Sequence, residues 1–279
     1  MLKLRILTAV ILGPLILWSV IAFSHRALAI ELGLVLVIAA WEWARLSGIQ
    51  NQLGRVIYSV LIAAAMLALT VLLHTRDDLL QPILIVVALW WLSALVVIIV
   101  FDAQQRQEQK TMTVNNIIIN LVSGLVILLG AFVSIIGLHQ APQYGYIFIL
   151  ILLVLIWLAD SAAYFSGKAF GKHKLAPHIS PGKTWEGVLG ALIATLIAAY
   201  IITHYLHYTG TATVLFVLIA LCTVIISIVG DLLESLFKRR AGVKDSSHLL
   251  PGHGGILDRI DSLVAAAPIF LLGLMLARL

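Results

Sequence analysis

The chain is poor in cysteine: its 279 residues include one, Cys222, inside a long apolar run. A single thiol excludes a disulfide framework and a thiolate metal site. We expect Cys222 to be a buried, inert packing residue.

Charge is also scarce. Only 11% of the residues are charged whereas 62% are hydrophobic, and the mean hydropathy is +1.08. This composition leaves too little polar surface for a soluble domain of this size. Gly/Ser linkers and internal repeats are lacking too. We therefore predict one all-α integral membrane domain over residues 1–279, with N-terminal helices in 1–145 and motif-bearing helices and loops in 146–279.

The sequence is rich in apolar runs of about 20 residues, the length that a helix needs to cross a bilayer core. We predict nine spans, at roughly 6–24, 27–43, 56–74, 81–101, 117–138, 146–166, 187–206, 212–230 and 256–278. The first run follows Lys3 and Arg5 as a signal peptide would, but no small-residue cleavage site precedes a soluble mature domain. We expect this run to remain as a span.

Basic residues are unevenly divided between the two sets of loops. With the N-terminus in the cytosol, the loops around 44–55, 102–116, 167–186 and 231–255 share its side. All but three of the eighteen Lys and Arg lie on that side. The positive-inside rule then predicts a cytosolic N-terminus and cytosolic motif loops. Because topology accounts for the net charge of +5, no nucleic-acid partner is indicated.

The densest charge lies between the last two spans, in residues 235–261. On a helix that continues past the eighth span, Asp231, Ser235 and Lys238 share one face because of their spacing. Ionisable groups at membrane depth normally face a protein interior or a wet cavity. A solvated helix end at the interface is the alternative for these three residues.

Two further carboxylates follow the turn at 251–255. The ninth span must begin after this turn, which places Asp258 and Asp261 at positions i and i+3. Helix capping would account for one such acid. Together with Asp231 from the adjacent helix, they could form the oxygen-rich site that Mg²⁺ prefers, with open positions for phosphate oxygens.

Bases and glycines complete this tract. Four bases are candidates to clamp a polyphosphate and offset charge in a phosphoryl-transfer transition state: Lys238, Arg239, Lys244 and Arg259. Gly254 and Gly255 would let the backbone approach phosphates closely. His253 is a further candidate for phosphate binding, although a structural role in the turn fits it as well.

A second polar tract follows the sixth predicted span. Asp160 lies in an apolar helix and needs a partner, either a lysine of the next loop or a cation, so it is a further candidate metal ligand. Three residues are candidates for substrate contact: Lys168, Lys183 and Glu186. A loop that only sets topology would also explain the lysines. We predict a helix start here, with Ser180 as N-cap and Pro181 at the first helical position.

The motif at 235–261 reads S-x-x-K-R, four residues, K-D, five residues, P-G-H-G-G-x-x-D-R-x-D. It resembles the defining motif of the CDP-diacylglycerol synthases, or phosphatidate cytidylyltransferases. The segments L-A-D-S-x-A-Y-F-x-G-K at 158–168 and S-P-x-K-T-W-E-G at 180–187 are similar to that family too. Trp41-Glu42-Trp43, which on residue types alone is typical of interfacial anchors, extends the resemblance toward its bacterial branch.

The resemblance implies transfer of a cytidylyl group from CTP to phosphatidic acid, with release of pyrophosphate, at the cytosolic boundary of a bacterial inner membrane. It assigns Mg²⁺ binding to three aspartates, Asp231, Asp258 and Asp261. The same resemblance implies nucleotide, phosphate or supporting contacts for five residues: Ser235, Lys238, Arg239, Lys244 and Arg259. Of these we expect Lys238 and Arg259 to act in catalysis together with the three aspartates. The resemblance also suggests a monovalent cation such as K⁺ and contact with membrane lipids. A homodimer stays open.

Two other classes compete with this interpretation. A CDP-alcohol phosphatidyltransferase would show D-G-x-x-A-R followed by G-x-x-x-D-x-x-x-D, which this sequence lacks. A cation or lipid transporter could place Asp160 and Asp231 along a pathway, but it would not need dense basic and glycine-rich loops.

Overall fold

The structure, a computed structural model, describes residues 2–106, 116–142, 144–250, 252 and 254–279. The first region contains α1 (Leu2–Ala22), α2 (His25–Leu46), α3 (Gln52–Thr75), the 3₁₀ turn η1 (Asp77–Leu79), α4 (Leu80–Arg106) and α5 (Ile117–His139). The second contains α6 (Gly145–Phe170), β1 (Lys174–Ala176), β2 (Ser180–Thr184), α7 (Trp185–Tyr205), α8 (Thr211–Arg240) and α9 (Leu257–Ala277).

Each α-helix coincides with one predicted apolar run, and several helices begin at a polar capping residue. Ser24, Asn51 and Asn116 accept backbone N–H groups in the first turns of α2, α3 and α5. Within the described residues, eight helices are long and apolar enough to cross a membrane, and the apolar stretch Val10–Ala22 of α1 is shorter. The predicted all-α polytopic membrane fold with about nine helices is confirmed.

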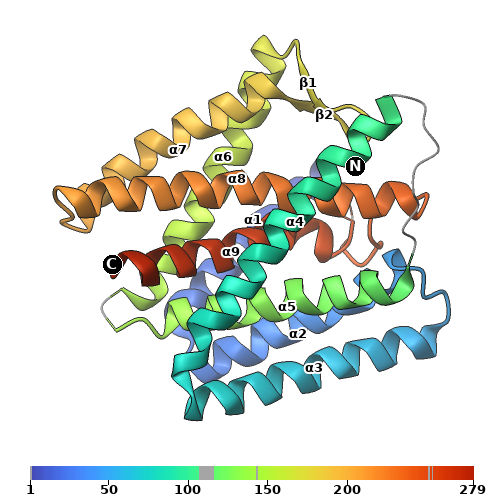
Figure 1. The fold of residues 1–279 in the computed structure, drawn as a ribbon, viewed down its shortest axis with the longest axis horizontal. Helices are drawn as coiled ribbons and strands as arrows, with labels where there is room; N and C mark the ends of the chain where they lie inside the picture. Colours follow the sequence, from blue (N-terminus) through green and yellow to red (C-terminus); the bar gives the residue numbers. More distant parts are fainter. Residues whose placement is uncertain (1, 107–115, 143, 251, 253) are drawn as a thin grey trace.

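The helices form layers around a central pair. In Figure 1, α8 and α9 run through the middle, α2, α3 and α5 pack on one side and α7 lies on the other, while α4 and α6 run across the bundle. The turn between α2 and α3, the C-terminal end of α8 and the hairpin of β1 and β2 all lie at the same end (Figure 1). This placement agrees with the grouping of loops predicted from the basic residues.

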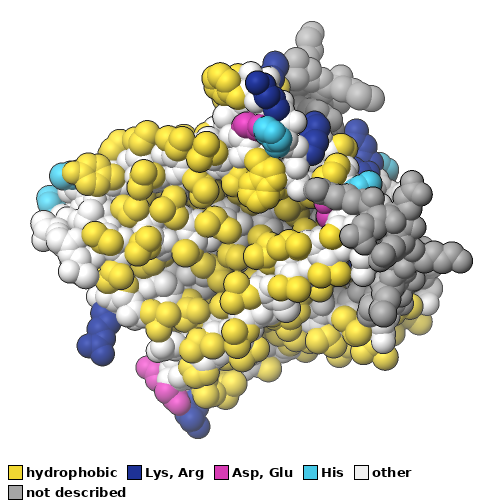
Figure 2. Space-filling view, turned by 45° about the horizontal axis from the view of Figure 1, so that its top comes forward, with side chains coloured by type: hydrophobic (Ala, Val, Ile, Leu, Met, Phe, Trp, Pro, Cys, Tyr) yellow, Lys and Arg dark blue, Asp and Glu magenta, His cyan; other side chains and the backbone are white. Residues whose placement is uncertain are grey.

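The surface is that of a protein surrounded by lipid. Hydrophobic side chains cover a broad band, and charged side chains gather toward the ends of the molecule (Figure 2). Cys222 is exposed on this surface, so the prediction that it is buried is wrong. Apolar residues of a membrane protein face lipid as readily as the core, and sequence polarity alone does not separate the two.

A short antiparallel hairpin interrupts the helices where the sequence predicted a helix start. Lys174 pairs with Thr184, and Ala176 pairs with Ser180. Helix α7 begins at Trp185, and Thr184 caps it by accepting the N–H of Gly187 at 3.1 Å. The prediction that Ser180 and Pro181 start a helix is therefore wrong, because the strand pairing continues to Thr184.

Candidate functional site

The α8 and α9 helices approach closely at Gly230. A Cβ atom placed on Gly230 would come within 2.5 Å of the carbonyl oxygen of Asp261 and 2.6 Å of the Cβ of Ala265. Small residues permit such close packing of membrane helices. This contact brings the segment that carries Asp231 against the first turns of α9, as the sequence predicted.

Next to this contact lies a cavity of about 650 Å³ that both polar tracts line. Its walls come from α6, the hairpin, α7, α8 and α9. The predicted site residues on its lining are Asp160, Lys168, Lys183, Asp231, Lys238, Asp258, Arg259 and Asp261. Asp245, which the sequence did not single out, lines it too. The two tracts, about 70 residues apart along the chain, thus form one site.

Lys183 joins the tracts directly. Its Nζ atom lies 2.7 Å from Oδ2 of Asp231, and both side chains are partly exposed to the cavity. Ser235 donates to Oδ1 of the same carboxylate at 3.4 Å, as expected for a pair one helical turn apart on α8. Asp231 therefore already has one cationic and one hydroxyl partner.

Lys238 lies deeper, between two carboxylates. Its Nζ atom donates to Oδ1 of Asp258 at 2.6 Å and to Oε2 of Glu234 at 2.5 Å. Glu234 is 2% exposed, and its Oε1 atom has no hydrogen-bond partner among the described residues. Glu234 was not among the predicted site residues, although its position four residues before Lys238 places the two side chains next to each other on a helix.

Asp258 is held by the loop that precedes α9. Its Oδ2 atom accepts the N–H of Ser246 at 2.9 Å, the hydroxyl of Ser246 at 2.8 Å and the N–H of Gly255 at 2.7 Å. With Lys238 on Oδ1, four donors surround this carboxylate. Such a shell fixes the orientation of the side chain and stabilises its charged form.

The glycines of the turn serve this packing. Gly254 has a φ of +86°, which favours glycine. A Cβ atom on Gly255 would come within 2.0 Å of Oγ of Ser246 and 2.6 Å of Oε1 of Glu42. These two glycines therefore let the loop close around the carboxylates, a role different from the predicted approach to phosphates. His253 lies outside the described residues.

Other predicted residues lie away from the cavity lining. Arg239 donates to the carbonyl of Ile179 at 3.2 Å, and Glu186 pairs with the ring of His173 at 2.7 Å. Both contacts hold the hairpin, with Arg239 joining it to α8. Lys244 is exposed on the loop after α8. Ser235 contacts the site only through Asp231.

The acidic oxygens suit a hard cation, but they do not form a complete ligand set. In the described part of the chain, no three His, Cys, Asp or Glu side chains are arranged to hold a metal ion. Asp258 is buried and engaged by its four donors, whereas Asp231, which contacts Lys183 and Ser235, stays partly exposed. Asp160 and Asp261 also line the cavity, and the buried Oε1 atom of Glu234 has no hydrogen-bond partner in the described part of the chain. The chemistry of these donors fits Mg²⁺.

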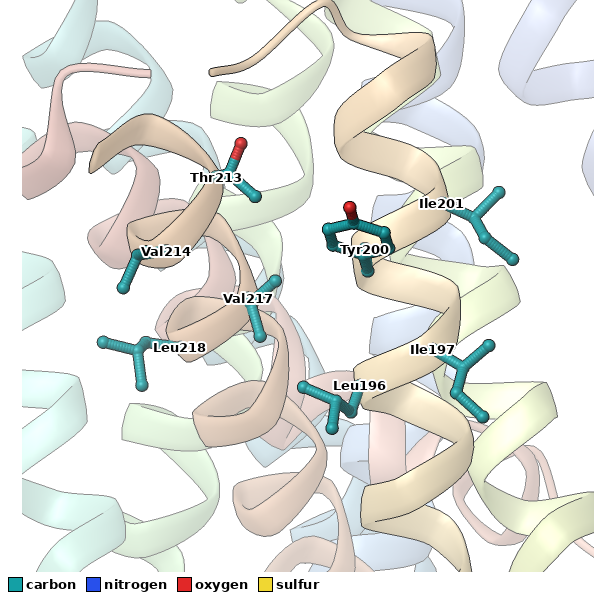
Figure 3. Close-up of a pocket in the computed structure, with 8 residues that line it drawn as sticks. All are labelled: Leu196, Ile197, Tyr200, Ile201, Thr213, Val214, Val217 and Leu218. Carbon is teal, nitrogen blue, oxygen red and sulfur yellow. The ribbon is translucent and has the colours of Figure 1, made fainter. Parts of the chain in front are cut away.

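A second pocket, of about 500 Å³, lies between α7 and α8, away from these charges. Figure 3 shows its lining on the two helices: Leu196, Ile197, Tyr200, Ile201, Thr213, Val214, Val217 and Leu218. No charged side chain lines it. It is therefore unsuited to a nucleotide.

Comparison with known proteins gives consistent matches. The sequence profile of the cytidylyltransferase family matches residues 3–277. A phosphatidate cytidylyltransferase of Pseudomonas aeruginosa is 44% identical over 270 residues, which cover 97% of this chain and 96% of that protein. One of Haemophilus influenzae is 38% identical over 288 residues, covering 97% of each chain. One of Brucella suis is 44% identical over 135 residues, about half of each chain.

Proposed function

The chain belongs to the cytidylyltransferase family, and we propose that it transfers a cytidylyl group from CTP to phosphatidic acid. The products are CDP-diacylglycerol and pyrophosphate. The observation that carries this proposal is the single cavity in which Lys168, Lys183 and Arg259 face Asp160, Asp231 and Asp261. A cavity with cations and carboxylates suits a reaction between two phosphates.

The position of the cavity suits the two substrates. It lies where the polar tracts meet, at the end of the bundle that carries the hairpin and the loop between α8 and α9. CTP would enter from water at that end. Phosphatidic acid would enter sideways from the adjoining leaflet, past the lipid-facing side chains of Tyr164 and Phe165 on α6. In this proposal that end faces the cytosol of a bacterial cell, at its inner membrane, as the positive-inside rule favours.

The reaction is a displacement at phosphorus. An oxygen of the lipid phosphate attacks the α-phosphorus of CTP, an O–P bond forms, and the bond to the β-phosphate oxygen breaks as pyrophosphate leaves. Lys168, Lys183 and Arg259 would orient the phosphates and offset their charge in the transition state. Lys238, held between Glu234 and Asp258, would add a fixed positive charge to the cavity that receives these phosphates.

In this proposal Mg²⁺ would be held by Asp231 and Asp261, with Asp160 as a further ligand. The ion supplies positive charge to the phosphate oxygens. Asp258 acts as a supporting residue, because its oxygens already accept four hydrogen bonds. A monovalent cation such as K⁺ is a further part of the proposal.

A labelling experiment tests this function. Purified protein in detergent, with Mg²⁺ and phosphatidic acid, should move label from α-³²P-CTP into lipid. Label from γ-³²P-CTP should appear in pyrophosphate and not in lipid, which separates cytidylyl transfer from phosphorylation. Diacylglycerol in place of phosphatidic acid is the control acceptor. Absence of lipid label with every divalent ion tried, or turnover in excess EDTA, would contradict the proposal or its metal.

A further inference from the structure

A buried carboxylate outside the cavity, that of Glu42 near the C-terminal end of α2, contacts the loop that builds the site. Its exposed fraction is 0%, and it is not among the residues that line the cavity. On residue types alone, Glu42 belongs to a segment that is typical of interfacial anchors. In the structure it is enclosed by protein instead.

Four donors surround this carboxylate. Its Oε1 atom accepts the N–H of Ile256 at 3.0 Å and the hydroxyl of Ser247 at 2.5 Å. Its Oε2 atom accepts the N–H of Leu257 at 2.7 Å and the hydroxyl of Ser246 at 3.1 Å. All four donors belong to the loop before α9 or to the start of that helix, more than 200 positions along the chain.

Glu42 acts as the N-terminal cap of α9, which has no capping side chain of its own. Ile256, the residue at the N-cap position of α9, provides no side-chain hydrogen bond. The first N–H groups of a helix need acceptors, and a negative charge there is favoured by the helix dipole. Glu42 meets both needs from a different helix. The start of α9, and with it Asp258, Arg259 and Asp261, is therefore fixed relative to α2.

The same contacts reach the cavity through Ser246. The single hydroxyl proton of Ser246 is shared between Oε2 of Glu42 at 3.1 Å and Oδ2 of Asp258 at 2.8 Å, which links the two carboxylates. Asp258 in turn holds Lys238. Arg45, three residues after Glu42 on α2, adds a long contact from Nη1 to the carbonyl of Ser246 at 3.5 Å. The absence of a side chain at Gly255 leaves the space in which these groups meet.

We propose that Glu42 is a positioning residue for the cytidylyl-transfer site, acting through the start of α9 and the loop at 246–247. A packed apolar side chain at this place would avoid the cost of burying a charge. The carboxylate instead gives the loop four fixed acceptor contacts. The inference rests on the proposed function, since its main measure is the rate of that reaction.

The test is Glu42→Gln, which keeps the shape but turns one oxygen into a donor that faces other donors. Misplacement of catalytic groups by about 1 Å from a distant change costs about 10²-fold in rate. We expect kcat to fall by about 10–100-fold, with the KM for CTP changed less than about threefold, because Glu42 does not touch the cavity. Glu42→Asp, which keeps the charge on a shorter side chain, should recover part of the lost kcat.

The matched control is Trp43→Phe. It removes another buried hydrogen bond of α2, from Nε1 to the carbonyl of Asn120 at 2.8 Å, which joins α2 to α5 instead of to the loop. It should lower thermal stability and leave kcat near that of the unchanged protein. Wild-type kcat in a folded Glu42→Gln protein would overturn the inference. So would equal losses of kcat in Glu42→Gln and Trp43→Phe, since they would indicate a general loss of packing.

If Glu42→Gln does not fold, Ser247→Ala removes one of the four donors with little change in volume. It should fold and lower kcat by a smaller factor, about threefold to tenfold. An unchanged kcat there would overturn the inference. Failure of the proposed function is distinct, because the unchanged protein would then make no labelled lipid at all.

Discussion

The helices before residue 145 and those after it are similarly apolar, but they differ in where their charged side chains lie. Helix α3 has a mostly exposed apolar surface. Its Tyr58 donates to the carbonyl of Leu121 on α5, and its exposed Thr70 donates to the carbonyl of Met66 in its own helix. Helices α6, α8 and α9 instead carry Asp160, Asp231, Asp258 and Asp261 on faces that meet in one cavity. The cost of a carboxylate at membrane depth is tolerated where a cavity and cationic partners receive it.

The comparison also shows that the two regions are not independent. Helix α5 packs along α9, and α2 supplies Glu42 to the start of α9. A division at residue 145 therefore describes where the motif residues lie in the sequence. It does not describe how their geometry is maintained.

The largest expected effect comes from removing a charge at the cavity. Asp231→Asn and Asp261→Asn should each lower kcat by about 10²-fold or more, the scale for an interaction made in the transition state. The measurement is α-label transfer into lipid, with folding checked by size-exclusion chromatography. Asp78→Asn is the control, since Asp78 is exposed and pairs with Arg76 near η1. Near-normal rates in Asp261→Asn would remove that residue from the site.

Gly255→Ala should have the next largest effect. The added methyl group must displace Ser246 or Glu42, and overpacking of this kind costs about 1–3 kcal/mol. We expect a lower melting temperature together with a fall in kcat. Gly33→Ala is the matched control, because no atom lies within 4 Å of its added Cβ and Gly33 lies on α2, outside the cavity lining. Similar behaviour of the two variants would show that the loop can rearrange around the carboxylates.

The cavity aspartates and Gly255 illustrate what the sequence could predict and what it could not. Local spacing predicted the spans and the shared face of Asp231 and Ser235. It also predicted that Asp258 and Asp261 lie at positions i and i+3 in the first turns of α9. The approach of Gly255 to phosphates stays a prediction, but its close contacts with Glu42 of α2 and Ser246 of the loop could not be predicted. Contacts between distant segments leave no periodic signal. Glu42 looked like an interfacial residue for that reason, and Ser180 looked like a cap because strand pairing is not visible in a five-residue segment.

A smaller effect on kcat/KM for CTP should distinguish a substitution of Lys183 from one of Arg239. Lys183→Gln removes a cation that lines the cavity and contacts Asp231, so kcat/KM for CTP should fall by about tenfold, or about 1.4 kcal/mol. Arg239→Gln loses one hydrogen bond to the hairpin, worth about 1 kcal/mol of stability. Its kcat/KM should change less. Equal losses for both variants would place Arg239 at the substrate.

The smallest effect on activity, and the sharpest test of orientation, is expected from single cysteines in the loops. Cys222→Ala should be nearly silent, because Cys222 lies on the exposed apolar surface of α8. In that background, Gln50→Cys and Lys174→Cys should keep activity. Both variants, and Lys244→Cys, should resist a membrane-impermeant thiol reagent on intact cells. Asp77→Cys and Thr209→Cys, at exposed positions on the opposite set of loops, should react. All but three basic residues favour this orientation. Labelling of Lys174→Cys or Lys244→Cys from outside would place the cavity on the wrong side for CTP, and the proposed reaction would fail with the topology.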